Sequence, residues 1–293
     1  MDGVIVVDKP QDWTSHDVVN RMRRIANTKK VGHLGTLDPI ATGVLPLIVG
    51  RATRLAQFYT HSDKIYEGVV RFGFSTNTYD RAGDPTSEPV EPSFSDAALE
   101  AALDRFRGEF KQTPPPVSAK KVAGKRAYEL ARKNIAVELA PVPVHVYEAA
   151  VLERNGSEVR IRVHCSGGTY VRSIAHDAGQ LLGCGAHLKE LRRVASGEFE
   201  AAQARTLQQL ESLAAEERLI DALVPMGDLL PGFTSVFVDD LTATQIRNGR
   251  NFPASPFRSQ PASRFVKAVT RQNELVAIGE AVLPNLYHPA VVL

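Results

Sequence analysis

The segment of residues 32–50 constrains the fold more than any other part of the chain. It reads GHLGTLDPIATGVLPLIVG and contains a single carboxylate, Asp38, among glycines, small residues and aliphatic residues. Its glycines allow backbone angles and close contacts that other residues resist, and residues 45–49 have the composition of a short strand buried on both faces. The segment therefore predicts an acidic side chain on a rigid, partly buried loop, where we expect the chemistry to take place.

The pair Asp38-Pro39 has a second interpretation. Many helices begin with Asp as the N-cap and Pro at the first helical position. A simple cap, however, requires neither His33 five residues earlier nor the surrounding glycines. We favour the catalytic interpretation because other segments, described below, point to the same site.

Composition indicates an ordinary globular protein of one large and one small domain. The chain has 293 residues, of which 43% are hydrophobic and 23% are charged, enough to bury a sizeable core. No apolar run reaches the ~18 residues of a membrane helix, and no signal-like segment opens the chain. We therefore expect a cytoplasmic protein without a membrane partner. Cys165 and Cys184 fit no metal-ligand spacing, and we expect both to be small buried residues.

Charge is unevenly distributed, although the net charge is only +2. Acidic residues gather between positions 80 and 104, and basic residues form three clusters. Such segregation suits a protein that turns one face to a polyanion, while solvated helix faces are the alternative for each cluster taken singly. The clusters are Arg21, Arg23, Arg24, Lys29 and Lys30; Lys120, Lys121, Lys125, Arg126, Arg132 and Lys133; and Lys189, Arg192 and Arg193.

Apolar periodicity and capping residues predict an α+β fold. Helices are expected after Thr14 or Ser15, after Ser95 and after Thr206, together with a short helix at 53–58. Asn155-Gly156 predicts a hairpin between strands 144–154 and 158–165. Residues 76–92 are expected to be a surface loop and 225–231 a linker. Further strands are predicted at 4–7, 64–73, 236–238, 265–269, 275–278 and 281–283, with a short helix at 242–248.

Several single residues allow two interpretations. Lys9 is either a solvated turn residue or a support for the neighbouring site, and Tyr66 is either a core aromatic or part of that site. Arg172 falls in the first turn of a helix, where the dipole disfavours a cation. It is therefore either an exposed residue with a small penalty or the partner of a specific acid. The proline-rich residues 111–121 form either a linker or an arm that faces RNA.

Five motifs occur in one order along the chain, and their combination resembles the bacterial tRNA pseudouridine-55 synthase (TruB) family. The resemblance covers most of residues 2–230. One departure is Gly167, at a place where the family often has Lys, which would remove a phosphate contact. The motifs are Lys9-Pro10; Gly-His33-Leu-Gly-Thr-Leu-Asp38-Pro-Ile-Ala-Thr-Gly; Lys64-Ile-Tyr66; Pro-Pro-x-x-Ser-Ala-x-Lys, which ends at Lys121; and Gly-Thr-Tyr170-Val-Arg172.

The resemblance implies an isomerase that breaks the glycosidic bond of uridine 55 in the T-loop of tRNA, turns the base and rejoins it through C5. Asp38 matches the covalent catalyst, Tyr66 the residue that stacks on the base, and Arg172 the partner of the aspartate. The resemblance implies tRNA as the partner, bound by its T-arm, with no cofactor, no metal and no obligate protein partner. Residues expected to contact RNA are His33, Lys9, Tyr170, Lys120, Lys121, Arg23 and Arg24.

The family fold is a mixed, largely antiparallel sheet flanked by helices. We expect a catalytic domain at residues 1–230 with an RNA-binding insertion at about 76–135. Residues 234–293 resemble, more weakly, a small RNA-binding barrel of the PUA type. Two other functions remain open at this point: a tRNA-binding or folding factor that does not catalyse, and the catalytic subunit of a guide-RNA-directed complex. The absence of visible extensions for partner proteins disfavours the second.

Overall fold

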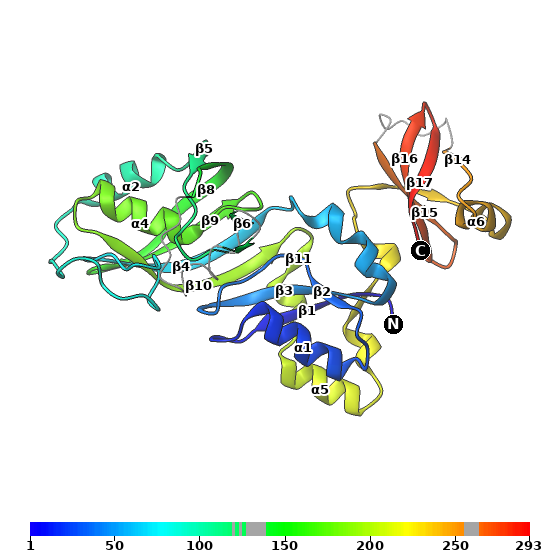
Figure 1. The fold of residues 1–293 in the computed structure, drawn as a ribbon, viewed down its shortest axis with the longest axis horizontal. Coiled ribbons are helices and arrows are strands. Elements are labelled where there is room, and N and C mark those ends of the chain that lie inside the picture. Colours follow the sequence, from blue (N-terminus) through cyan, green and yellow to red (C-terminus); the bar gives the residue numbers. More distant parts are fainter. Residues whose placement is uncertain (119–120, 123–124, 127–138, 255–263) are drawn as a thin grey trace.

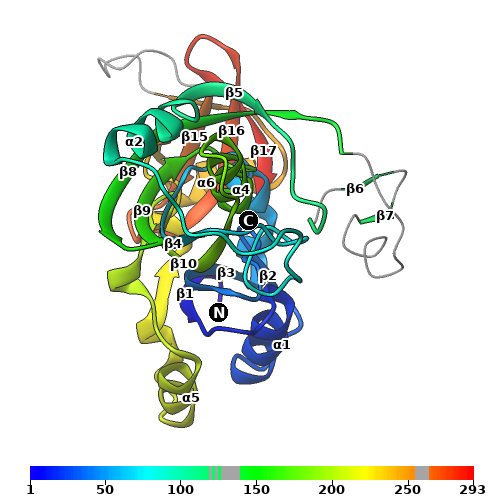
Figure 2. The ribbon, with the colours of Figure 1, turned by 90° about the vertical axis from the view of Figure 1, so that its left-hand side faces the viewer.

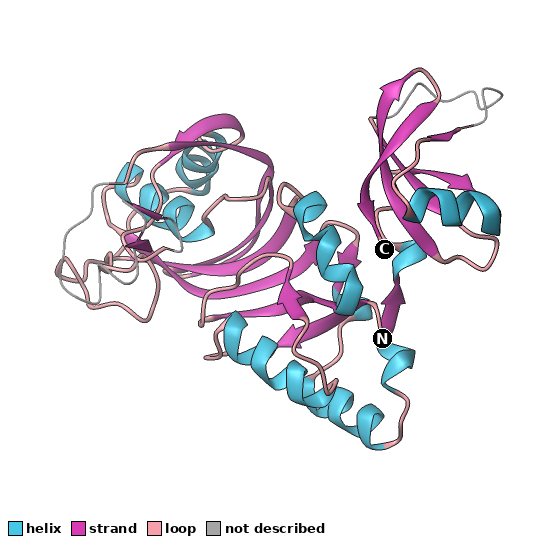
Figure 3. Cartoon of the chain, turned by 45° about the vertical axis from the view of Figure 1, so that its right-hand side comes forward, coloured by secondary structure: helices cyan, strands magenta, loops and turns pink. Residues whose placement is uncertain are grey.

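The computed structural model describes residues 1–118, 121–122, 125–126, 139–254 and 264–293. Within them, ten strands form one large, curved sheet that runs along the long axis of the molecule (Figures 1 and 3). Its described pairings are antiparallel except that of β3 with β10. The predicted mixed, largely antiparallel sheet is therefore confirmed. In spatial order the path comprises β12 (Leu223–Pro225), β1 (Gly3–Lys9), β3 (Ala41–Val49), β10 (Ala186–Ser196), β4 (Lys64–Phe72), β9 (Glu158–Cys165), β8 (Val142–Asn155) and β5 (Gly108–Gln112), with β2 (Val31–His33) on β3 and β11 (Phe199–Glu200) on β10.

Helices cover the sheet in two groups. Helix α1 (Ser15–Ile25) packs beside α5 (Leu207–Ala215), and α2 (Asp96–Asp104) packs beside α4 (Val171–Leu181) at the other end of the sheet (Figures 1 and 2). Thr14 caps α1, and Thr206 caps α5 in a capping box, as predicted. Residues of α1 and α4 join a single apolar core with the sheet strands. One continuous apolar core therefore extends beneath both groups of helices.

Local corrections concern lengths and borders. The helix predicted at 53–58 is a 3-10 helix, η1 (Gly50–Tyr59), and the helix after Ser95 ends at Asp104 rather than at Gly108, because Gly108 already begins β5. The hairpin around Asn155-Gly156 has the predicted strands, and Gly156 has a positive φ of 59°. The side chain of Lys121, in β6 (Lys121–Val122), and all of Lys120 lie outside what the structure describes.

The C-terminal region contains a second sheet of five described strands, at one end of the molecule (Figure 1). Residues 275–283 form one strand, not the two predicted, because the strand continues through a bulged register, and the strand at 286–292 was not predicted. The elements are β13 (Thr234–Phe237), α6 (Asp240–Arg247), β14 (Phe252–Pro253), β15 (Phe265–Val269), β16 (Leu275–Leu283) and β17 (Leu286–Val292).

The segment predicted as a linker, 225–231, is partly buried: Met226, Gly227, Leu229 and Leu230 are buried, and the other residues are exposed. Lys267 on β15 donates from its Nζ to the carbonyl oxygens of Gly227 at 2.9 Å and Leu229 at 2.7 Å. Leu229 has no exposed surface, and Val4 of β1 shares an apolar cluster with Ile278 of β16. A composition rich in Pro and Gly predicted a free connection, but apolar side chains on both sides fix it in place.

Gly43 on β3 allows a close approach of the backbone of β10, a few residues after Asp38. Its φ is +97°, and a Cβ there would lie 2.2 Å from the carbonyl oxygen of Arg193. We expect Gly43→Ala to destabilise the protein by about 3 kcal/mol or more, because strain and a backbone clash combine. Gly183→Ala is the control: its φ is +72° but no atom lies within 4 Å of the added Cβ, so about 1 kcal/mol is expected. Equal losses in urea unfolding would show that the backbone clash at Gly43 adds nothing to the strain.

Candidate active site

Asp38 lies on the loop between β2 and β3. No helix begins there among the described residues: the amide of Ala41 donates to the Asp38 carbonyl oxygen at 3.0 Å, and β3 begins at Ala41. The alternative of a simple helix cap is therefore wrong for Asp38. Its side chain is 36% exposed, so the carboxylate is reachable from outside while the loop that carries it is fixed.

Arg172 is the partner of Asp38. Its Nε lies 2.8 Å from Oδ2 of Asp38, an ion pair that lacks hydrogen-bond angles, and its second contact is with Asp80 at 3.3 Å. The guanidinium, 4% exposed, also donates to the carbonyl oxygens of Thr78 at 3.1 Å and Val117 at 3.0 Å. Two carboxylates and two carbonyls explain why a cation is tolerated in the first turn of α4, against the helix dipole. The predicted pairing with a specific acid is present.

Asp80 was not predicted as a site residue, because its sequence surroundings placed it among surface acids. The residue is 5% exposed, and its Oδ1 accepts from the Thr78 hydroxyl at 2.7 Å and the Ala82 amide at 3.0 Å. Tyr79, at φ 65°, stacks on the ring of His176 with 3.7 Å between centroids. His176 lies one turn after Arg172 on α4, so the 76–84 turn docks on this helix. A loop composition gave no signal that this acid would be buried.

A pocket of about 250 Å³ opens beside Asp38. Tyr66 on β4 and Tyr170, the residue before α4, bring aromatic rings to it, and burial raises the pKa of both phenols. Gln112 fixes the second ring by bonding both backbone groups of Tyr170, at 2.8 and 3.0 Å. The pocket thus has flat apolar walls next to a carboxylate. Its lining residues are Gly35, Thr36, Leu37, Asp38, Thr60, Lys64, Tyr66, Ser166, Gly168, Thr169, Tyr170, Val171, Arg172, Leu191 and Arg193.

Arg193 belongs to this pocket and not to a phosphate-binding face. It is 1% exposed, and its guanidinium donates to three carbonyl oxygens: Val44 at 2.7 Å, Gly35 at 3.1 Å and Thr36 at 3.3 Å. Arg192 is paired with Asp8 of β1, and Lys189 with Glu158 of β9. The third basic cluster of the sequence is therefore mainly structural, and Arg193 holds the loop that leads to Asp38.

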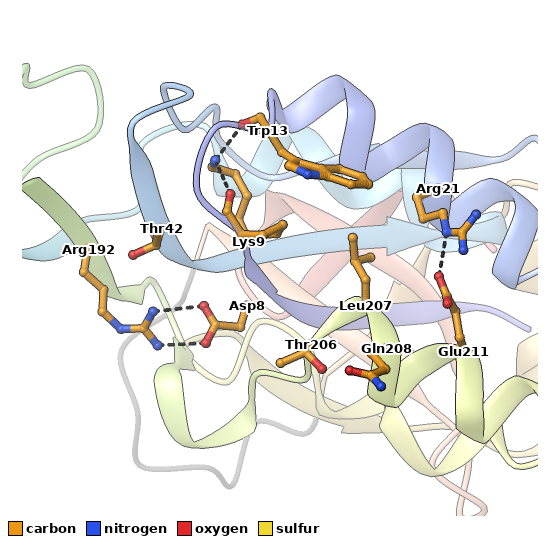
Figure 4. A pocket seen from close by; sticks show the side chains of 11 residues that line it. Asp8, Lys9, Trp13, Arg21, Thr42, Arg192, Thr206, Leu207, Gln208 and Glu211 are labelled. Atoms are coloured by element: carbon orange, nitrogen blue, oxygen red, sulfur yellow. Dashed lines mark hydrogen bonds and ion pairs between the residues drawn. The ribbon is translucent and has the colours of Figure 1, made fainter. Parts of the chain in front are cut away.

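Lys9, predicted to contact RNA, is buried, and its ammonium group is bound by carbonyl oxygens of the protein. Its Nζ donates to the carbonyl oxygens of Trp13 at 2.6 Å and Pro10 at 2.9 Å (Figure 4), and to that of Pro39 at 3.3 Å. Burial lowers the pKa of Lys9 to about 8, against the opposing charge of Asp38. The interpretation of Lys9 as a support is the one that its contacts favour, because it ties the residue after Asp38 to the turn before α1.

A larger hollow of about 740 Å³ lies beside Trp13, between α1 and α5 (Figure 4). It shares no lining residue with the Asp38 pocket. The cations on its border are already paired, Arg192 with Asp8 and Arg21 with Glu211. The chemistry-bearing side chains named by the sequence gather in the smaller pocket, which we therefore take as the candidate site.

Three other predicted RNA contacts, His33, Arg23 and Arg24, are not among the residues that line the pocket. His33 ends β2, opposite Leu47, and does not line the pocket. Arg23 donates to Asn20 Oδ1 at 3.0 Å and to the Val31 carbonyl oxygen at 3.1 Å. Arg24, in contrast, is exposed. Of these two predicted contacts, Arg24 is thus available to a partner, whereas Arg23 ties α1 to β2.

Comparisons with known proteins place this geometry in a family. The family model described as TruB family pseudouridylate synthase (N terminal domain) matches residues 23–171, and that described as tRNA pseudouridylate synthase B C-terminal domain matches residues 172–231. The chain belongs to the TruB family of pseudouridylate synthases. The N-terminal family model covers Asp38 and Tyr66, and the boundary between the two models falls at Arg172.

Relatives in the TruB family match over nearly the whole chain. The tRNA pseudouridine synthase B of Solibacter usitatus is 75% identical over 293 residues, covering 100% of both chains. That of Aromatoleum aromaticum is 44% identical over 251 residues, covering 85% of this chain and 80% of its own. A chain in a crystal structure of a Cbf5-Nop10-Gar1 complex matches with 30% identity and a TM-score of 0.72, covering 97% of this chain and 79% of its own. Both kinds of match confirm the resemblance.

The described residues offer neither a metal centre nor a membrane span. No group of three or more His, Cys, Asp or Glu side chains among them is arranged to hold a metal ion. Nor is any helix in this part of the chain both long and apolar enough to cross a membrane. Cys165 is buried, as predicted, and burial raises its pKa to about 11, whereas Cys184 is only partly buried.

Within this TruB-family site, Arg172→Lys tests the ion pair. Lys keeps the charge but loses the planar guanidinium that reaches Asp38, Asp80 and two carbonyls together. We expect the single-turnover rate to fall at least about tenfold, or ~1.4 kcal/mol of transition-state stabilisation, with a smaller change in tRNA affinity. Rapid-quench rates and filter-binding constants measure the two effects. An unchanged rate with weaker binding would instead identify Arg172 as a phosphate contact.

Proposed function

We propose that this protein is a tRNA pseudouridine synthase that isomerises uridine 55 in the T-loop of tRNA. The observation that carries the proposal is the Asp38 carboxylate, held by Arg172 at 2.8 Å beside a pocket walled by Tyr66 and Tyr170. Support comes from the full-length match to a tRNA pseudouridine synthase B. A nucleophilic carboxylate next to flat aromatic walls suits a single nucleotide that is turned out of its stack.

The reaction requires three changes to the nucleotide. The C1′–N1 bond breaks, the base turns, and a C1′–C5 bond forms; the C5 proton leaves and N1 gains a proton. Asp38 serves as the covalent catalyst, at either C1′ of the ribose or C6 of the base. Because the nucleotide is neither oxidised nor reduced overall, the reaction needs no redox cofactor. Tyr66 stacks on the base, and Arg172, itself held by Asp80 and two carbonyl oxygens, orients the Asp38 carboxylate.

RNA binding is proposed to involve the T-arm, with positive charge from α1 and from the segment that contains Lys120 and Lys121. His33 is proposed to hold the T-loop once the base has turned out. The C-terminal sheet, at residues 234–293, is proposed as the PUA-like RNA-binding domain beside a catalytic domain at 1–230. Phosphate contacts of this kind supply affinity more than sequence specificity.

Two alternatives are separated by one experiment. A non-catalytic tRNA-binding factor would bind an unmodified transcript without releasing tritium from C5 of uridine. A guide-RNA-directed subunit, which the similarity to a chain of an H/ACA RNP structure at 26% identity and TM-score 0.75 keeps in view, would require added RNA and proteins. Release from the purified chain alone, abolished when position 55 of the transcript is cytidine, supports the proposal. No release from the wild-type protein would overturn it.

Asp38→Asn is expected to bind tRNA nearly as the wild type does and to form no pseudouridine. The substitution keeps size and shape but removes the charge and the nucleophilicity. Nucleoside analysis of single-turnover digests measures the product, and filter binding measures affinity. Pseudouridine formation at the wild-type rate would exclude Asp38 as the covalent catalyst.

Arg23 and Arg24 form a matched pair for RNA affinity. Arg24 is exposed, whereas Arg23 is held by Asn20 and the Val31 carbonyl oxygen. If Arg24 contacts a phosphate, Arg24→Ala should reduce the slope of log affinity against log salt by about one. Arg23→Ala should leave the slope unchanged and lower thermal stability instead. Identical slopes for both variants and the wild type would place the RNA on another face.

A further inference from the structure

Lys64 and Arg193 are two buried cations that meet at the pocket. Lys64, at the start of β4, is 7% exposed, and Arg193 is 1% exposed. A Cβ placed on Gly35 would lie 3.7 Å from Lys64 Cε and 3.6 Å from Arg193 NH1, so both side chains converge on the loop that leads to Asp38. Both line the pocket with Tyr66. Burying two like charges together is costly unless something compensates them.

Neither cation has an acidic partner in the described part of the chain. Lys64 donates to the carbonyl oxygen of Ser62, and Arg193 donates to three carbonyl oxygens. Burial, and next the charge of Arg193, lower the pKa of Lys64, whereas Cys165 and then Asp63 raise it; the Asp63 carboxylate is paired with His164. The positive charge of Lys64 and Arg193 is therefore not neutralised by a carboxylate of the described residues.

The second set of charges at the pocket, Arg172 with its acids, has more negative than positive charge. Arg172 faces two carboxylates, Asp38 and Asp80. Burial is the largest influence on the pKa of the Tyr66 hydroxyl and raises it. The charge of Arg193 lowers this pKa, and the charge of Asp38 raises it. A base stacked at Tyr66 thus lies between a site with surplus negative charge and one with surplus positive charge.

We propose that Lys64, reinforced by the fixed charge of Arg193, stabilises the negative charge that develops on the uracil base during catalysis. This inference rests on the function proposed above. If the C1′–N1 bond breaks first, its electron pair stays with N1 and the base becomes an anion delocalised onto O2 and O4. If Asp38 instead adds to C6, the electrons of the C5=C6 bond move toward O4. Both routes put negative charge on the base, so the proposal holds for either order of steps.

The geometry suits such a role because the cation is fixed before the charge appears. Preorganised charges in a water-poor site act on the transition state without the cost of reorientation. Residue 167 contributes to this arrangement: a Cβ there would lie 3.2 Å from Lys64 Nζ and 2.9 Å from the Thr60 carbonyl oxygen. Glycine at this position therefore leaves room next to the ammonium group.

The test compares Lys64→Met with Lys64→Arg on an unmodified tRNA transcript. Met keeps the length and loses the charge, so we expect the single-turnover rate to fall at least about a hundredfold with tRNA affinity changed less than about threefold; Arg should recover part of the loss. Lys189→Met is the control, because Lys189 lies on β10, outside the pocket, and pairs with Glu158. Its rate should equal that of the wild type.

Two further measurements exclude other roles of Lys64. Removal of an uncompensated buried cation should leave the melting temperature of Lys64→Met unchanged or raise it, whereas a structural lysine would lower it. A transcript with 5-fluorouridine at position 55 carries a base that holds negative charge more easily, so loss of the parent nucleoside should be slowed less by Lys64→Met. A fall in affinity and salt slope at an unchanged rate would overturn the inference in favour of a phosphate contact. An inactive wild type would overturn the proposed function instead.

Discussion

The contact between Arg172 and its two carboxylates holds three distant parts of the chain together. Asp38 comes from the loop before β3, Asp80 from the turn after β4, and the arginine from the start of α4. A 4% exposed guanidinium without these acids would be an uncompensated buried charge, which costs several kcal/mol. The acids therefore allow the arginine to be buried, and the arginine in turn fixes the carboxylate that we assign to catalysis.

Backbone carbonyls perform a similar task elsewhere in the molecule. Lys9 donates to the carbonyl oxygen of Pro39, and Arg193 donates to those of Gly35 and Thr36. Lys267 donates in the same way to two carbonyl oxygens of the segment between the two sheets. A long cationic side chain can satisfy several carbonyl oxygens that no strand pairs, so irregular backbone becomes fixed without regular secondary structure. The Asp38 loop is held from both sides in this way, which fits a site that must keep its geometry while RNA binds and leaves.

The sequence predicted what depends on local pattern. Strand β3, the hairpin at Asn155-Gly156 and the capping box at Thr206 follow from periodicity, turn chemistry and capping. The burial of Asp80 and the lack of an acidic partner for Lys64 among the described residues depend on which residues meet in space. Composition carries no such information. The basic cluster that contains Arg193 was misread for the same reason, because a one-dimensional charge pattern cannot distinguish a carbonyl-bound cation from an exposed one.

Charge placement also explains why one pocket can support a reaction whose steps differ in polarity. In the reaction that we propose, the base gains negative charge as its bond to the ribose weakens and loses it as the new bond forms. Under our proposal, the positive charge at Lys64 and Arg193 favours the first change, and the Asp38 carboxylate binds either the ribose or the base while the base turns. Because Lys64 and Arg193 lie on strands β4 and β10, and Arg172 on helix α4, we expect the base to turn while these charges stay in place.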